Sequence, residues 1–315
     1  MKKAMYRIWR DGEYDYPQAF GFVPKINAYL HEDENPRPCI LVVPGGAYLA
    51  VAPSEGELVA LKFYEMGYQT FALTYTTNFL CEEPLKLQPL RDISRAVRFI
   101  RSRAVEFGVE ENRLAVCGFS AGGHLSASLC VHFDDVKDET PEYAGISNRP
   151  DAAILSYPVI TSGEYAHRES FEALLGKDAS QEELAYMSLE HQVTADTPPC
   201  FVWATETDES VPVENSLLFI KACREHNVPC AFHMFSHGPH GLSLANEDWA
   251  EGRNQDPYTG EQIGNIIAKI QSGELPMPAA VQEMMKKQGA QEPKVPVPEV
   301  TVWPILADAF LQSHM

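Results

Sequence analysis

The stretch Gly118-Phe119-Ser120-Ala121-Gly122 lies between a short apolar run, residues 113–117, and a run of small and apolar residues, 123–130. The first run predicts a buried strand and the second predicts a helix, so Ser120 is expected at a tight strand-to-helix turn. Such a turn holds a serine in strained backbone geometry with its hydroxyl projecting from the edge of a sheet. Because Gly-x-Ser-x-Gly also arises by chance, its meaning depends on partners elsewhere in the chain.

Apolar runs alternate with helix-period stretches along most of the 315 residues. The predicted strands are residues 40–43, 70–73, 114–117, 152–155, 200–203 and 231–235, and the predicted helices are residues 57–66, 90–107, 123–130, 181–186 and 214–226. This alternation predicts an α/β fold with a doubly wound, mostly parallel sheet and helices on both faces. We expect a single domain over residues 1–315.

The predicted helix at residues 90–107 carries five arginines between its apolar positions: Arg91, Arg95, Arg98, Arg101 and Arg103. Apolar residues recur there at three- and four-residue steps, which is the pattern of an amphipathic surface helix. The arginines could form an anion site, but a solvated helix face is the favoured interpretation.

Residues 246–302 break the alternation, and we interpret them as an insertion before a final helix at residues 304–311. The insertion contains a polar run, two predicted short helices at 259–271 and 278–287, and a proline-rich segment at 293–298. Thr259 and Gln262 have the spacing of a capping box. A lid, a contact in a homo-oligomer and a surface excursion all fit this composition.

The bulk composition excludes several classes of partner. With 25 basic and 44 acidic residues the net charge is −19, which disfavours nucleic acid and anionic membrane surfaces. Two N-terminal lysines have no apolar run behind them and no segment is long enough to span a bilayer, so we expect a cytoplasmic protein. The seven cysteines fall mostly inside apolar runs, as reduced thiols do, and form no Cys-x-x-Cys pair for zinc.

A serine nucleophile needs an imidazole to take its proton and a carboxylate to orient that imidazole. The loop after the strand at 200–203 offers Asp208 as the preferred acid, with Glu206 and then Glu209 as alternatives. The loop after the strand at 231–235 offers two histidines. His240 is favoured over His237 because Gly241 lets the backbone turn, and a metal site would need a third ligand that the sequence does not offer. The order Ser120, Asp208, His240 is the one expected of an α/β hydrolase.

Acyl transfer also needs hydrogen-bond donors for the developing oxyanion. The backbone N–H of Ala121, which follows the nucleophile, is one expected donor. The glycine-rich stretch Val42-Val43-Pro44-Gly45-Gly46-Ala47-Tyr48 follows an early predicted strand and is expected to provide the other. Glycines there let backbone N–H groups point into a site, although the same residues could form a plain turn.

Four motifs together carry a resemblance to a known superfamily: Pro44-Gly45-Gly46-Ala47-Tyr48, Gly118-Phe119-Ser120-Ala121-Gly122-Gly123-His124-Leu125, Asp208-Glu209-Ser210-Val211-Pro212 and Pro239-His240-Gly241-Leu242. They resemble the α/β-hydrolase superfamily and, more narrowly, the bacterial acetylxylan and feruloyl esterases related to the hormone-sensitive-lipase group. The resemblance runs from about residue 26 to residue 244 and resumes near residue 303.

The resemblance implies a serine esterase that needs no cofactor and removes acetyl groups from plant-polysaccharide fragments. Carried onto this sequence, it implies Ser120 as nucleophile, His240 as general base and acid, and Asp208 as the orienting acid. The oxyanion donors would be Ala121 and either Gly46 or Ala47, because the His-Gly-Gly-Gly pattern of many relatives is replaced here by Pro44-Gly45-Gly46-Ala47.

The leading hypothesis is a carboxylesterase for short acyl esters, with O-acetyl groups on xylo-oligosaccharides as the expected substrate. One alternative is a peptidase that resembles the prolyl oligopeptidase catalytic domain, although no propeller-like segment precedes residue 26 in this sequence. A non-catalytic binding protein on a hydrolase scaffold is another alternative. A long-chain lipase is disfavoured because the insertion is polar, with only isolated apolar positions.

Overall fold

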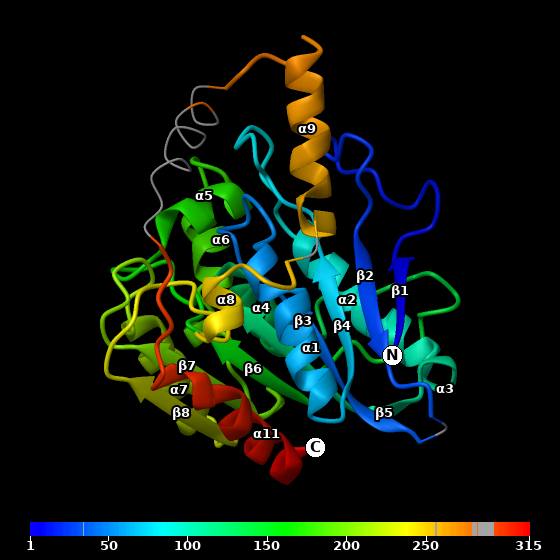
Figure 1. The fold of residues 1–315 in the computed structure, drawn as a ribbon. Helices are drawn as coiled ribbons and strands as arrows, with labels where there is room; N and C mark the ends of the chain where they lie inside the picture. The colour runs from blue at the N-terminus through cyan, green and yellow to red at the C-terminus, as the bar shows by residue number, and fades with distance from the viewer. Residues whose placement is uncertain (34, 256, 279–281, 283–292) are drawn as a thin grey trace.

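A twisted sheet of eight strands forms the centre of the molecule (Figure 1). The computed structural model describes residues 1–315 except 34, 256, 279–281 and 283–292. The sheet order is β1-β2-β4-β3-β5-β6-β7-β8. The strands are β1 (Lys2–Arg7), β2 (Lys25–Leu30), β3 (Arg37–Val43), β4 (Gln69–Thr74), β5 (Val109–Phe119), β6 (Ala152–Ser156), β7 (Cys200–Thr205) and β8 (Cys230–Phe235). Strands β3 to β8 pair in parallel, which confirms the predicted α/β architecture.

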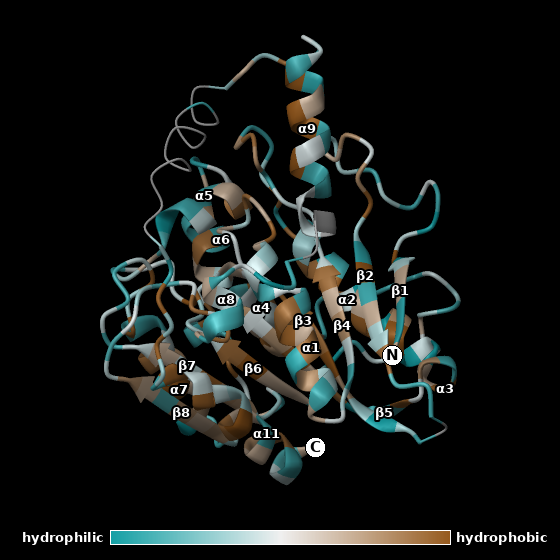
Figure 2. Cartoon of the chain, viewed as in Figure 1, coloured by the Kyte–Doolittle hydropathy of each residue, from teal (hydrophilic) through white to brown (hydrophobic). Residues whose placement is uncertain are grey.

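Helices cover both faces of the sheet. One face carries α2 (Gln88–Ser102), α4 (Ala121–His132), α5 (Arg168–Leu175) and α7 (Glu214–Glu225), with the short helices α3 (Ala104–Phe107) and α6 (Gln181–Tyr186) beside them. The other face carries α1 (Glu57–Glu65), α8 (Glu247–Ala250) and α11 (Trp303–His314). Side chains of β3 alternate between the two cores, with Leu41 and Val43 on the α4 face and Ile40 and Val42 on the α1 face. Figure 2 shows the resulting hydrophobic colouring of the central strands.

All six predicted strands are present, but the sheet also has two strands that the apolar-run pattern did not predict. Strand β2 pairs antiparallel with both β1 and β4. Strand β1 lies at the edge of the sheet, and its residues are largely exposed and include two lysines and an arginine. A charged edge strand of this kind has no apolar run to reveal it.

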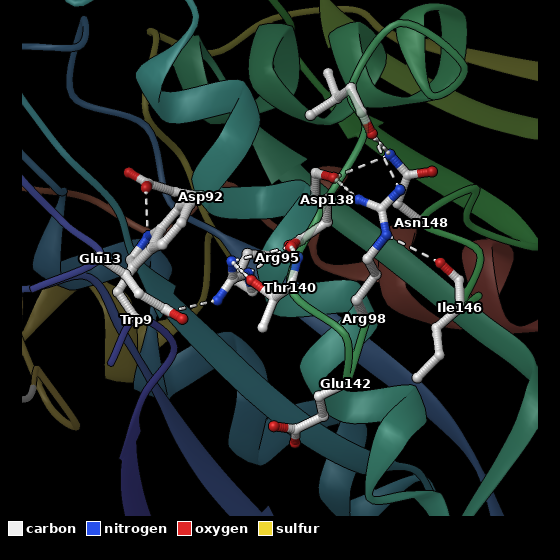
Figure 3. A network of polar contacts seen from close by, with 12 residues as sticks. Trp9, Glu13, Asp92, Arg95, Arg98, Asp138, Thr140, Glu142, Ile146 and Asn148 are labelled. Atoms are coloured by element: carbon white, nitrogen blue, oxygen red, sulfur yellow. Dashed lines mark hydrogen bonds and ion pairs between the residues drawn. The ribbon is translucent and has the colours of Figure 1, made fainter. Parts of the chain in front are cut away.

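The predicted helix at 90–107 is two helices, and the interpretation of its arginines as a solvated face is wrong for the central ones. The chain breaks at Arg103, between α2 and α3. The Arg95 side chain is only 4% exposed and donates to Asp138 at 2.5 Å and to Glu13 at 2.9 Å (Figure 3). Its guanidinium also lies 4.2 Å from the Trp9 ring centre. Arg95 therefore joins α2 to two loops rather than facing water.

Arg98 is buried in the same network. Its Nε donates to the carbonyl of Ile146 at 2.9 Å (Figure 3). One terminal nitrogen donates to the carbonyl of Val136 at 3.0 Å. Asn148 donates to the hydroxyl of Ser94 at 2.9 Å and so joins the loop before β6 to α2. Arg95 and Arg98 thus bond to protein acceptors, which argues against an anion site formed by these two residues.

The insertion begins with α8 and continues through a short 3-10 helix, Pro257–Gly260, into α9 (Glu261–Gln271). In Figure 1, α9 projects beyond the edge of the sheet where β4 ends. Its apolar residues, Ile266 among them, pack against Phe79 and Leu80. The predicted helix at 278–287 falls mostly outside the described residues. The final helix was predicted correctly and forms α11.

The predicted capping box at Thr259 and Gln262 is wrong. Gly260 is the N-cap residue of α9, with no side-chain cap. The Gln262 side chain is buried and bonds to Thr77, which follows β4. Its Oε1 accepts from the Thr77 N–H and hydroxyl, both at 3.0 Å, and its Nε2 donates to the Thr77 carbonyl at 2.7 Å. An ion pair between Lys25 and Glu261 adds a second tether, from β2.

All seven cysteines lie in the described ranges and none forms a disulfide; five are buried, as apolar side chains are. None of the described helices combines the length and apolar character that crossing a bilayer requires.

The buried Arg95 network generates a stability prediction. We expect Arg95→Ala to lower the free energy of unfolding by about 3–5 kcal/mol, because the substitution leaves Asp138 and Glu13 without their cation. Urea denaturation followed by circular dichroism measures the change. Arg91→Ala, on the exposed side of the same helix, is the matched control and should change stability by less than about 0.5 kcal/mol. Equal losses in the two variants would contradict a structural role for Arg95.

Candidate active site

Ser120 lies in the sharp turn between β5 and α4, where the sequence predicted it. Its φ of 52° and ψ of −119° lie in a region that residues other than glycine rarely adopt. Close packing explains the glycine at position 122, because a Cβ there would lie 2.1 Å from the Val43 carbonyl oxygen. The turn therefore brings Ser120 up against the loop that follows β3.

Three residues from three strand-end loops meet in a hydrogen-bonded series. The Ser120 Oγ lies 2.7 Å from Nε2 of His240, and Nδ1 of His240 lies 2.7 Å from Oδ2 of Asp208. The other oxygen of Asp208 accepts the backbone N–H groups of Ser210 and Val211, both at 2.9 Å. These bonds orient the Asp208 carboxylate. In this arrangement Asp208 accepts the Nδ1 proton, which leaves Nε2 free to accept the serine proton.

The other residues considered for these positions lie elsewhere. Glu206 and Glu209 are exposed, whereas Asp208 is buried. His237 is also exposed, and its Nδ1 bonds to Ser236 and pairs with Glu299 rather than facing Ser120. Of the residues considered, Asp208 and His240 are the ones that form the series with Ser120.

The loop after β3 has an unusual backbone. Gly46, Ala47 and Tyr48 have consecutive positive φ values of 117°, 56° and 60°. Within the described part of the chain, no acceptor takes the backbone N–H of Gly46, Ala47 or Ala121. Ala121 is also the first residue of α4, where a helix leaves its N–H groups without internal acceptors. All three N–H groups are thus without an acceptor among the described residues.

A buried pair ties this loop to the helix that follows the nucleophile. The Tyr48 hydroxyl lies 2.8 Å from Nδ1 of His124, and Nε2 of His124 lies 3.0 Å from the Met187 carbonyl oxygen. Burial lowers the pKa of His124 to about 4, so the ring stays neutral. It then accepts from Tyr48 and donates to Met187. Both residues were in the quoted motifs, but no spacing rule in the sequence pairs a tyrosine with a histidine 76 positions away.

The start of the insertion packs beside the histidine loop. The Trp249 indole N–H donates to the carbonyl of Gly241 at 3.1 Å. Near the end of the insertion, the N–H of Val297 donates to the carbonyl of Ala245 at 2.9 Å. The chain thus leaves and rejoins the body close to His240. Among the described residues, no group of three or more histidine, cysteine, aspartate or glutamate side chains is placed to hold a metal.

The chemical capacity of the arrangement follows from its contacts. A buried carboxylate orients an imidazole, the imidazole contacts a serine hydroxyl, and unpaired N–H groups come from the loops on either side. This set can transfer an acyl group to the serine and then to water.

Comparison with known proteins places the chain in a family. A family model described as BD-FAE matches residues 26–223. A crystal structure of an acetyl ester-xyloside bifunctional hydrolase from Caldicellulosiruptor lactoaceticus aligns with a TM-score of 0.72 and 37% identity. That alignment covers 83% of this chain and 97% of the other.

Two curated relatives extend the comparison. The chain is 51% identical over 262 residues to endo-1,4-beta-xylanase B of Butyrivibrio fibrisolvens, an alignment that covers 83% of this chain and 41% of the relative. It is 27% identical over 248 residues to an acetylxylan esterase of Xylanibacter ruminicola, covering 77% of this chain and 47% of the relative. The chain therefore spans less than half the length of either relative. With the match over residues 26–223 and the shared fold, the chain belongs to the BD-FAE family of α/β-hydrolase esterases and resembles acetylxylan esterases.

Proposed function

We propose that the chain is a serine carboxylesterase that hydrolyses short acyl esters through an acyl-enzyme. The observation that carries the proposal is the continuous series from Ser120 through His240 to Asp208, with 2.7 Å at both links. A serine hydroxyl is a weak nucleophile without a base in contact, and an isolated surface serine has no such partner.

In the proposed reaction, Ser120 Oγ attacks the ester carbonyl while Nε2 of His240 takes the hydroxyl proton. Asp208 holds the imidazole in the required tautomer and stabilises the imidazolium. His240 then gives its proton to the leaving alcohol. Water attacks the acyl-enzyme by the same route in reverse, which restores Ser120 and releases the acid.

Negative charge develops on the carbonyl oxygen in both steps. The N–H of Ala121 and an N–H of Gly46 or Ala47 are the proposed donors, supported by their unpaired state and by their places beside Ser120 and after β3. Losing one donor of this kind costs about 2.7–4 kcal/mol of transition-state stabilisation in enzymes of similar chemistry.

The proposed substrates are O-acetyl groups on xylo-oligosaccharides. Three similar proteins support this class: one is named an acetylxylan esterase, one an acetyl ester-xyloside hydrolase and one a xylanase. The protein named a xylanase is matched over only 41% of its length. Its name therefore supports a xylan-derived substrate for this chain, but not cleavage of glycosidic bonds. Two functions compete with this proposal: hydrolysis of peptides, and binding without catalysis on a hydrolase scaffold. A panel of peptide substrates tests the first, and labelling of Ser120 with a fluorophosphonate tests the second.

Ser120→Ala should lower kcat for p-nitrophenyl acetate and for acetylated xylo-oligosaccharides by roughly 10⁴-fold or more, because it removes the hydroxyl that contacts His240. The measurements are the acetate released from the oligosaccharides and the absorbance of the p-nitrophenolate released from the ester. Ser128→Ala is the matched control, since Ser128 is buried in α4 and its hydroxyl has no partner in the described chain. Full activity in Ser120→Ala would exclude the proposed mechanism.

The rate with p-nitrophenyl esters should fall beyond roughly four acyl carbons. A longer acyl group needs an apolar pocket, and the sequence of the insertion is mostly polar. A series from acetate to laurate measures kcat/KM for each ester. A maximum at the longer esters would indicate a lipase instead.

A further inference from the structure

A buried carboxylate behind the active site belongs to Glu55, which the sequence reasoning did not single out. Glu55 ends a short 3-10 helix, Pro53–Glu55, between the loop after β3 and α1, and it is 3% exposed. Its Oε2 accepts the backbone N–H of Gly45 at 2.7 Å, and its Oε1 accepts the hydroxyl of Tyr157 at 2.7 Å. One carboxylate thus bonds to two different strand-end loops.

The first of these bonds holds the loop that carries the proposed oxyanion donors. Gly45 lies against the nucleophile, because a Cβ there would be 2.6 Å from the Phe119 carbonyl oxygen and 2.8 Å from Cβ of Ser120. Gly46 follows directly, so a shift of the Gly45 N–H moves the next N–H groups relative to Ser120. Displacements of about 1 Å at such positions are enough to cost about 10²-fold in rate.

The second bond leads to the histidine loop. The Tyr157 hydroxyl accepts the backbone N–H of Ser243 at 2.9 Å, and its ring packs edge-on against His240 with 5.0 Å between ring centres. The Ser243 hydroxyl in turn donates to the Ser54 carbonyl at 2.6 Å. The segment that carries His240 is therefore attached to residues 54–55 through two routes.

Burial, hydrogen bonds and two basic side chains all act on the Glu55 carboxyl. Burial raises the pKa of its carboxyl, and the hydrogen bonds from Tyr157 and Gly45 oppose that rise. The cationic forms of His240 and Lys294 act in the same direction as those bonds. A carboxylate that only stabilised the fold could sit anywhere in the core, as Asp92 does within α2.

We infer that Glu55 is a positioning residue of the proposed esterase, which holds the oxyanion loop through Gly45 and the His240 loop through Tyr157 in one geometry. The inference rests on the proposed function, since it assigns Glu55 a part in the same reaction. Glu55 touches neither substrate nor reacting atoms. Its effect is to fix the distance between the donors on one side of Ser120 and the base on the other.

The test compares Glu55→Ala and Glu55→Gln using p-nitrophenyl acetate. We expect Glu55→Ala to lower kcat about 100-fold while KM stays within about threefold, because the donors act on the transition state more than on bound ester. Glu55→Gln should recover part of the loss, since the amide oxygen can still accept from Gly45. Tyr157→Phe should also lower kcat, and its loss should not add to that of Glu55→Gln.

The matched control is Asp92→Asn. Asp92 is fully buried and accepts hydrogen bonds from Trp9, Thr76 and Gln88, but it lies in the network of α2. It should lower the melting temperature without changing kcat. If Glu55→Ala does not fold, Glu55→Gln decides: a kcat at least tenfold lower at unchanged KM supports the inference, and an unchanged kcat overturns it. An inactive wild-type protein would remove the proposed function and this inference together, whereas an active wild type with an equally active Glu55→Gln overturns this inference alone.

Discussion

The backbone of Ser120 is the constraint on which the candidate site depends. Backbone hydrogen bonds on both sides hold its positive φ. Its N–H donates to the carbonyl of Ser156 at 3.0 Å, and its carbonyl accepts the backbone N–H groups of His124 at 3.0 Å and Val159 at 3.1 Å. A strained residue persists only where its surroundings determine it this fully. The same bonds lock the β5–α4 turn to the end of β6, so the hydroxyl has a fixed position for the loops around it to meet.

Much of this site could be predicted because its residues lie in local sequence patterns. The alternation of apolar runs and helix-period stretches predicted β3 to β8, and the loops after β5, β7 and β8 each contained a residue type that acyl transfer needs. Asp208 was the preferred acid of its loop, and His240 was preferred over His237 because a glycine follows it; the structure joins both to Ser120 in one hydrogen-bonded series. Parallel strands end at one edge, so residues just past strand ends are brought together by the topology itself.

The remainder depends on contacts that no local pattern encodes. Glu55 resembles any surface glutamate in the sequence, and only the approach of Gly45 and Tyr157 shows that it is buried and bonded. The prediction for Arg95 was wrong in the opposite direction. Amphipathic spacing predicts a solvated cation, but the acidic side chains of Glu13 and Asp138, from distant loops, pair with it and cover it. Gln262 had the spacing of a cap and instead bonds across 185 positions. In each case a tertiary partner outweighs the local preference.

The tether between α9 and the loop after β4 also determines how the insertion could be transplanted. Gln262 satisfies the N–H, hydroxyl and carbonyl of one buried residue, Thr77. Removing it would leave those buried groups unpaired, at a cost of about 1–3 kcal/mol for each group. Any chimera that replaces the insertion with that of another esterase must therefore replace the segment around Thr77 at the same time. The unit of exchange is the pair of segments, although 185 positions separate their two contact residues.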